Sequence, residues 1–250
     1  MRDAGACGPR AGQTAGRRWR AAIPLLVTLL PAVMPAARAA DDDSGLWLAA
    51  FGQGSLGAAG TEAGRVRWWL DLQARWRDGG DELDATLVRP ALGYAVTPAV
   101  ALHAGYALVT THPAGPAGAA TEHRPWQQLT WTLPATAVAL TSRTRLEQRF
   151  PEGTGEAGHR LRQFVRVTRR ARDGGAGYLT AYDEVFVELN DTGWGQRAGI
   201  RQNRAFAGLG WFIDRQRRTA IEVGYLNQWL DRAGTDRVSH LLSVNLFINR

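Results

Sequence analysis

The sequence predicts an all-β fold, a single antiparallel up-and-down transmembrane β-barrel of about 10–12 strands, and three observations support it. Residues Arg65–Trp76 alternate charged and apolar side chains, so a strand there has one charged and one apolar face. The alternation recurs at intervals of about 15–25 residues to the C-terminus, which is typical of membrane barrels. Most of the alternating segments have roughly 12–15 residues, whereas strands of soluble proteins usually have about 5–6.

The chain divides into eleven such segments, joined by connections of two kinds. The segments are 46–54, 64–76, 82–96, 99–110, 122–133, 136–150, 159–171, 177–190, 201–213, 217–231 and 238–249. Tight turns are expected at 96–98, 133–135 and 173–177, and longer loops at 111–121, 151–158 and 191–200. Short periplasmic turns that alternate with longer extracellular loops are a further property of outer-membrane barrels.

The sequence leaves the number of strands open. Bacterial single-chain barrels have an even number of strands, but the segments number eleven. If the C-terminus is periplasmic, segment 64–76 runs outward and is the first full crossing. Segment 46–54 is then an inward-folded or periplasmic piece, which gives ten strands, or one strand is missing from the assignment, which gives twelve.

A soluble β-sandwich that serves as a periplasmic binding module is the alternative fold. The segments are long enough for membrane strands, which need about 9–11 residues, and this length favours the barrel. The sandwich would be extracted without detergent.

Residues 1–39 have the pattern of a cleaved export signal, and residues 40–250 form the predicted outer-membrane barrel domain. Arg17, Arg18 and Arg20 precede a short apolar run at 21–33, and residues 37–39 read Ala-Arg-Ala, a small-x-small cleavage pattern. The apolar run is shorter than the roughly 20 residues of a membrane-spanning helix. We therefore expect export to the bacterial outer membrane and a mature chain without cysteine, because Cys7 is the single cysteine.

The net charge does not indicate a nucleic-acid partner once the export signal is removed. The whole chain has 30 basic and 23 acidic residues, a formal charge of +7, and all the basic residues are arginine. Six arginines and one aspartate precede residue 40, which leaves 24 basic and 22 acidic residues. The expected partners are outer-membrane lipid and lipopolysaccharide, with the barrel-assembly machinery during biogenesis.

Charged side chains share one face on segments 136–150, 159–171 and 177–190, opposite aliphatic side chains. An arginine on the lipid-facing side at mid-bilayer costs about 2–4 kcal/mol. Three arginines on segment 136–150 and four on segment 159–171 must therefore face the interior of the barrel. The predicted interior residues are Arg143, Arg145, Glu147, Arg149, Arg160, Arg162, Arg166, Glu184, Glu188, Arg204 and Glu222.

Two details of this assignment are specific enough to check. Asp183 falls with the apolar side chains of its strand, which a bulge near Tyr182 or a position at the membrane edge would explain. Arg166 and Glu184 are candidates to face each other on neighbouring strands.

The interior has two possible uses. Side chains just fill a barrel of about 8 strands, whereas about 16–18 strands leave an aqueous channel. A barrel of intermediate size is either filled by paired charges with a structural role or holds a narrow pore that prefers anions because arginine is in excess.

The sequence offers no catalytic or cofactor-binding motif. Nucleophilic catalysis requires serine and histidine side chains on the same face within hydrogen-bond reach. Ser239 and His240 are adjacent and therefore point to opposite faces, and His103 has no serine on its own strand. The five histidines have no metal-ligand spacing. We expect no cofactor, no metal and no enzymatic activity; modification of lipid or lipopolysaccharide by a cross-strand site is the alternative.

Six segments together resemble a Gram-negative family of presumed outer-membrane β-barrels, catalogued as domain of unknown function 2490. They are EHRPWQQLTW (122–131), TRLEQRF (144–150), YLTAYDEVFVELN (178–190), QNRAFAGLGW (202–211), GYLNQW (224–229) and SHLLSVNLF (239–247). The resemblance spans residues 46–249 and implies the fold and the location, but no catalytic residues. The family's recurrent polar positions correspond here to Glu122, Arg124, Gln127, Gln128, Arg145, Glu147, Arg149, Asp183, Glu184, Asn203, Arg204, Asn227 and Gln228.

Overall fold

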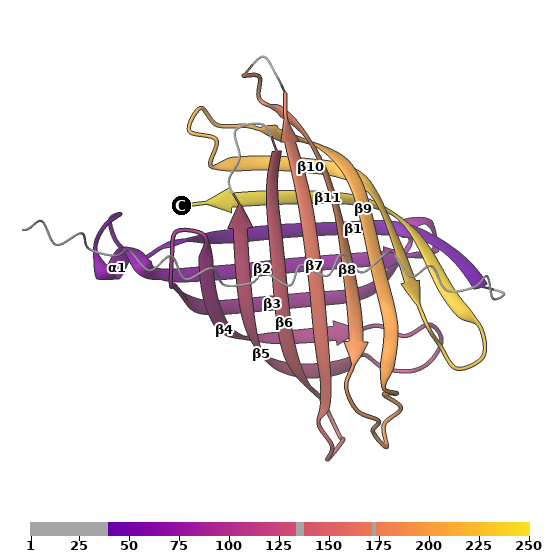
Figure 1. Cartoon of the computed structure of the whole chain (residues 1–250). Helices are drawn as coiled ribbons and strands as arrows, with labels where there is room; N and C mark the ends of the chain where they lie inside the picture. Colours follow the sequence, from indigo (N-terminus) through magenta and orange to yellow (C-terminus); the bar gives the residue numbers. More distant parts are fainter. Residues whose placement is uncertain (1–39, 134–137, 172–173) are drawn as a thin grey trace, which may run out of the picture. The chain divides into compact units, whose positions relative to one another are not determined.

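The structure, a computed structural model, describes residues 40–133, 138–171 and 174–250, in which eleven strands form one closed barrel (Figure 1). The strands are β1 (Ala40–Ser55), β2 (Val66–Arg77), β3 (Glu82–Ala95), β4 (Val100–Thr111), β5 (Ala120–Leu133), β6 (Val138–Pro151), β7 (Gly158–Arg170), β8 (Gly177–Glu188), β9 (Gly199–Phe212), β10 (Thr219–Leu230) and β11 (Asp236–Asn249). Two short helical turns, α1 (Glu62–Arg65) and η1 (Asp78–Gly80), lie on either side of β2. In the described ranges, no helix has the length and apolar character to cross a membrane.

The predicted all-β barrel is confirmed, and every predicted segment is a strand. Their ends agree with the prediction to within two residues, except that β1 begins at Ala40, six residues early. The predicted export signal, most of the turn at 133–135 and part of the turn at 173–177 lie outside the described residues.

The expectation of an even number of strands is wrong, because β1 is a full strand of the barrel. It pairs antiparallel with β2 and parallel with β11. In an up-and-down barrel with an odd number of strands, the first and last strands run in the same direction, so only a parallel pair can close it. The register of this pair places Phe51 beside Phe247, whose rings stack with their centroids 5.0 Å apart.

Because the number of strands is odd, Ala40 and Arg250 lie at opposite ends of the barrel. We call these ends the N-terminal rim and the C-terminal rim. The N-terminal rim contains Ala40 and the connections 78–81, 112–119, 152–157, 189–198 and 231–235. Among the described residues, the C-terminal rim contains Arg250, the connections 56–65, 96–99 and 213–218, and residues 174–176. Accordingly, α1 and the C-terminus lie at the same end of the barrel in Figure 1.

Side chains alternate between the outer surface and the interior along every strand, as the pleat requires. The outer surface carries many exposed aliphatic side chains, for example Leu92, Leu179 and Leu242. The interior is divided between two walls. A buried apolar cluster lies on β1 and β9–β11, and most of the charged side chains lie on β5–β8. The cluster consists of Trp47, Ala49, Phe206, Leu226 and Leu241.

Tryptophans on the outer surface lie near both rims. Trp68, Trp131 and Trp211 are near the C-terminal rim, and Trp76 and Trp229 are near the N-terminal rim. Three further tryptophans, Trp47, Trp69 and Trp126, point into the barrel, so the tryptophans of the strands are divided between the outer surface and the interior.

Candidate functional site

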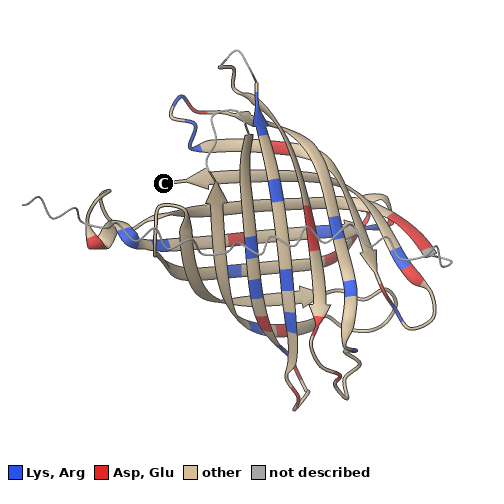
Figure 2. Ribbon diagram, viewed as in Figure 1, with Lys and Arg blue, Asp and Glu red and all other residues tan. Residues whose placement is uncertain are grey.

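Charged side chains of β2, β3 and β5–β9 meet inside the barrel and form a connected set of ion pairs. Figure 2 shows the arginines as blue bands along β6 and β7, beside acidic bands on β8. We call this set the ion-pair network. It consists of Asp71, Arg89, Glu122, Arg124, Arg143, Arg145, Glu147, Arg149, Arg160, Arg162, Glu184, Glu188 and Arg204.

Glu147 lies at the centre of the ion-pair network and is fully buried. Its carboxylate accepts a hydrogen bond of 2.6 Å from Arg162 on the neighbouring strand β7. Arg145 and Arg89 also approach it, at 3.6 and 3.8 Å. Arg89 belongs to β3, which is not a neighbour of β6 in the sheet, so this contact reaches through the interior of the barrel.

Glu184 forms a second group of contacts on β8. It accepts hydrogen bonds from Arg162 at 2.8 Å and from Arg143 at 2.9 Å. Arg204 of β9 approaches it to 3.7 Å. Because Arg162 contacts both Glu147 and Glu184, these two groups of charges are joined.

Two further carboxylates extend the network to the N-terminal rim. Glu122 accepts a two-bond contact from Arg149, with distances of 2.6 and 2.9 Å, and a similar contact from Arg124. Glu188 accepts hydrogen bonds from Arg160 at 2.7 Å and from Arg149 at 3.1 Å. Such paired contacts fix both partners, since the planar guanidinium matches the carboxylate.

Aromatic rings lie against several arginines of the network. The Arg145 guanidinium lies 4.3 Å from the ring centroid of Trp126. Arg162 and Arg204 each lie 4.6 Å from the centroid of Phe186. A ring face attracts a cation, so these contacts help the barrel to hold eight arginines against five carboxylates.

A smaller cluster lies outside the network. Arg166 forms an ion pair with Glu222 of β10, and the Tyr178 hydroxyl donates to the same carboxylate at 2.8 Å. The suggested pairing of Arg166 with Glu184 is wrong, because the register of β7 and β8 places Arg166 opposite Tyr182. This prediction was wrong because the sequence of the two strands alone does not determine their register.

All eleven predicted interior residues point to the inside of the barrel in the structure. Nine belong to the ion-pair network, and Arg166 and Glu222 form the smaller cluster. The list of predicted interior residues did not include Arg89, Asp71 or Trp126. Arg89 has apolar neighbours on its own face, for example Leu87, so the charge pattern of its strand gives no signal. Asp71 lies in the charged half of an alternating strand and was detectable.

A cavity of about 480 Å³ lies between the network and the C-terminal rim. Its inner end is lined by Arg143, Arg162 and Glu184, and its outer end by Arg170 and Asn249. Threonines of β5, β6 and β7 and several aromatic rings form its walls. We call it the C-terminal cavity.

Ser239 and His240 point to opposite faces, as predicted. Ser239 is buried inside the barrel, whereas His240 is exposed and lies 2.5 Å from the Tyr225 hydroxyl. His103 points inward and its ring lies edge-on to Trp69, with centroids 5.9 Å apart. Over the described parts of the chain, no three or more histidine, cysteine or acidic side chains gather as possible metal ligands.

Asp183 is on the outer surface, and neither explanation offered for it is correct. It is the seventh of the twelve residues of β8, far from either rim, and the register shift of this strand lies between Phe186 and Val187. The amide of Asn203 donates to the Asp183 carboxylate at 3.0 Å. A hydrogen bond from the next strand therefore partly offsets the exposure of this charge.

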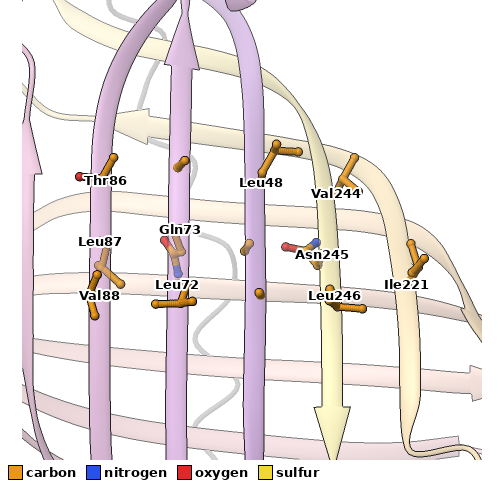
Figure 3. A pocket seen from close by; sticks show the side chains of 13 residues that line it. Leu48, Leu72, Gln73, Thr86, Leu87, Val88, Ile221, Val244, Asn245 and Leu246 are labelled. Carbon is orange, nitrogen blue, oxygen red and sulfur yellow. The ribbon is translucent and has the colours of Figure 1, made fainter.

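A shallow groove of about 520 Å³ crosses the outer surface over β1 and its neighbours (Figure 3). Leu48, Leu72, Val88, Ile221 and Leu246 line it, and the small side chain of Ala50 leaves the space between them. The groove is apolar and lies at the parallel seam between β1 and β11.

The fold is a closed β-barrel with an apolar outer surface and paired charges inside, so the protein belongs to the class of β-barrel proteins. The model of the family described as "Protein of unknown function (DUF2490)" matches residues 44–239, and the chain belongs to this family. An uncharacterised protein of Methylorubrum extorquens is 35% identical over 230 residues, which cover 90% of this chain and 96% of that protein. No solved structure matches.

Proposed function

We propose that the protein is an integral outer-membrane β-barrel whose interior is closed by the ion-pair network and has a structural, non-catalytic role. The observation that carries this proposal is the contact between Arg89 and Glu147, which joins strands that are not neighbours. Arg145 and Glu147 are both almost fully buried at this level of the barrel. Side chains at this level thus fill part of the cross-section that a pore would need, which supports a closed interior.

The outer surface supports a membrane location. Trp68 and Trp76 both point outward on β2, eight residues apart. At about 3.3 Å per residue and a strand tilt of about 35–45°, they are separated by roughly 20 Å along the barrel axis. This distance is close to the apolar band of about 25 Å that lies between the aromatic belts of membrane barrels.

The rims support an orientation with the C-terminal rim in the periplasm. The connections 112–119 and 189–198 lie at the N-terminal rim, and the tight turn 96–99 lies at the C-terminal rim. The segment 56–65, which contains α1, is an exception. Because β1 and β11 are parallel, this orientation places the start of β1 outside the cell.

Cysteine labelling tests the orientation. In intact cells, a membrane-impermeant maleimide is expected to label D41C at the start of β1 and not Q216C in a turn of the C-terminal rim. The natural chain has one cysteine, Cys7, which would be removed with residues 1–39. Each variant would therefore contain only the introduced cysteine. The reverse pattern would show that the barrel has the opposite orientation.

The main test combines gel mobility with conductance. The protein is expected in the outer-membrane fraction, with different mobility before and after boiling, and without channel events in planar bilayers. The combined variant Arg145→Ala, Glu147→Ala, Arg162→Ala is expected to conduct, because it removes the side chains at the centre of the network. Channel events from the unaltered protein would favour the narrow pore, and a soluble protein with unchanged mobility would overturn the barrel in the membrane.

The non-catalytic role has a separate test. Lipid A and phospholipids are compared by mass spectrometry in cells with and without the protein. Unchanged profiles are expected, and a modified lipid that depends on the protein would favour an enzyme.

A further inference from the structure

The C-terminal cavity has the form of a ligand site. Its volume of about 480 Å³ is within the range of roughly 300–1,000 Å³ for small-molecule sites. It ends at the buried charges of the network and extends to side chains at the C-terminal rim, for example Arg170 and Asn249. The cavity therefore lies on the side of the network that faces the C-terminal rim.

The inner walls of the cavity suit a flat apolar group. Phe164 and Tyr182 lie with their ring centroids 5.0 Å apart on one side. Phe51 and Phe247 stack at the same centroid distance and are inclined by 15°. Ring faces of this kind pack against another ring in offset or edge-on arrangements.

Threonine hydroxyls complete the walls between the rings. Thr130 and Thr132 of β5 and Thr141 of β6 line the cavity. Hydroxyl groups donate and accept hydrogen bonds and rotate to suit their partner. The wall of the cavity thus combines aromatic rings with hydroxyl, amide and charged groups, which can orient a small molecule.

The outer end of the cavity is basic. The guanidinium groups of Arg170 and Arg217 lie 5.9 and 5.8 Å from the ring centroid of Phe212. Arg217 donates to the carbonyl oxygens of Gly174 and Gly175 in the neighbouring turn. Among the described residues, neither arginine forms an ion pair with a carboxylate, in contrast to the arginines of the network.

The turn that carries Arg217 is held by Asp214. Its carboxylate accepts hydrogen bonds from the backbone N–H of Thr219 at 2.6 Å and of Arg218 at 3.1 Å. These donors lower the pKa of Asp214, so the carboxylate stays ionised and continues to hold the turn. The position of Arg217 is therefore fixed by its own turn and by the two carbonyl oxygens.

We infer that the C-terminal cavity binds a small amphipathic anion, an aromatic carboxylate, with its ring among Phe164, Tyr182 and Phe247 and its carboxylate at Arg170 and Arg217. The ring enters first, because the aromatic side chains lie deeper than the two arginines. The carboxylate remains at the rim, where cationic groups are not already neutralised by buried acids. This binding goes beyond the proposed function and does not require the barrel to conduct.

The test is calorimetric titration of the folded, detergent-solubilised protein with 2-naphthoate. Binding to one site per barrel is expected, and the neutral analogue 2-naphthamide is expected to bind at least tenfold more weakly. Trp47 and Trp69 line the cavity, so a change in tryptophan fluorescence gives a second measurement of the same event. Equal binding of the acid and the amide would overturn the inference.

Three variants locate the site. Arg170→Gln is expected to weaken 2-naphthoate binding about tenfold, and Thr141→Trp, which fills the cavity, is expected to abolish it. Arg215→Gln is the matched control, since Arg215 belongs to the same turn as Arg217 but does not line the cavity. Gel mobility before and after boiling shows that each variant is folded. Unchanged binding by the first two folded variants would assign the heat signal to the detergent or another surface, while the location and conductance tests of the proposed function would be unaffected.

Discussion

The two halves of the barrel interior are built from the same strands but differ in what fills them. On β6 the inward side chains are Ala139 and Thr141 toward the C-terminal rim, and Arg145 and Glu147 toward the N-terminal rim. The backbone continues unchanged between these two pairs. The size and charge of a few side chains therefore decide whether this barrel is closed or hollow at a given level.

The two halves also differ in how they tolerate the loss of one side chain. In the N-terminal half the carboxylates of Glu122, Glu147 and Glu188 each contact at least two arginines, so removal of one of them leaves several cations buried together. In the C-terminal half the cavity already contains empty space. Substitution of an uncharged side chain there, such as Thr141, changes local contacts without leaving a buried charge unpaired.

The largest expected effect follows from this difference. Glu147→Leu should lower the free energy of unfolding by about 3–5 kcal/mol, because it breaks buried ion pairs from one side. Thr141→Val on the same strand should change it by less than about 1 kcal/mol. Unfolding in urea, followed by the mobility of the folded band on gels, measures both variants.

Arg162→Ala provides a control for this comparison. Glu147 keeps Arg145 and Arg89 nearby, and Glu184 keeps Arg143, so the variant should assemble and lose less stability than Glu147→Leu. If Thr141→Val and Glu147→Leu were equally stable, the buried charges would have no structural role.

The outer surface should tolerate a charge less well than the interior. Val223 lies opposite Val244 and Leu209 on the outer face, so Val223→Arg should cost about 2–4 kcal/mol near the middle of a bilayer. The measurement is the amount of heat-modifiable protein in the outer-membrane fraction. Val165→Arg is the sharper comparison, because the new arginine would lie directly opposite Asp183.

We expect more assembled protein for Val165→Arg than for Val223→Arg, since the nearby carboxylate offsets part of the cost. If both variants assembled as well as the unaltered protein, the faces would be assigned the wrong way round. The comparison thus tests the inside and outside of the barrel and the register of β7 with β8 together.

The strands were predictable because the alternation of side chains is a local property. In β2, Asp71 and Arg75 fall on one face and Leu70 and Leu72 on the other, and no knowledge of neighbouring strands is needed. The strand count failed for a different reason. The rule of even numbers describes barrels closed by an antiparallel pair, whereas the direction of β1 relative to β11 is settled only when the sheet closes.

The sequence predicted most of the residues of the ion-pair network but not the contacts between them. Alternation directed Arg162 and Glu184 inward, yet their pairing depends on the register between β7 and β8. The part played by Arg89 depends on a contact between strands that are not neighbours. The C-terminal cavity is less predictable still, because it exists where small side chains from several strands, such as Thr130 and Thr141, meet at one level.

The smallest expected effect concerns the one carboxylate in the middle of the outer face of β8. Asp183→Asn keeps a side chain that can exchange a hydrogen bond with Asn203 and removes a charge from the surface that we propose to face lipid. Acidic side chains on the lipid-facing side cost less than the roughly 2–4 kcal/mol of arginine, so a gain in stability of about 1 kcal/mol is expected. Urea unfolding in lipid vesicles measures it, and Asp183→Ala, which leaves the Asn203 amide without this partner, should gain less. A loss of stability with Asp183→Asn would instead show that the carboxylate has a charged partner outside the barrel, and the outer face of β7–β9 would then be a contact surface and not a lipid-facing one.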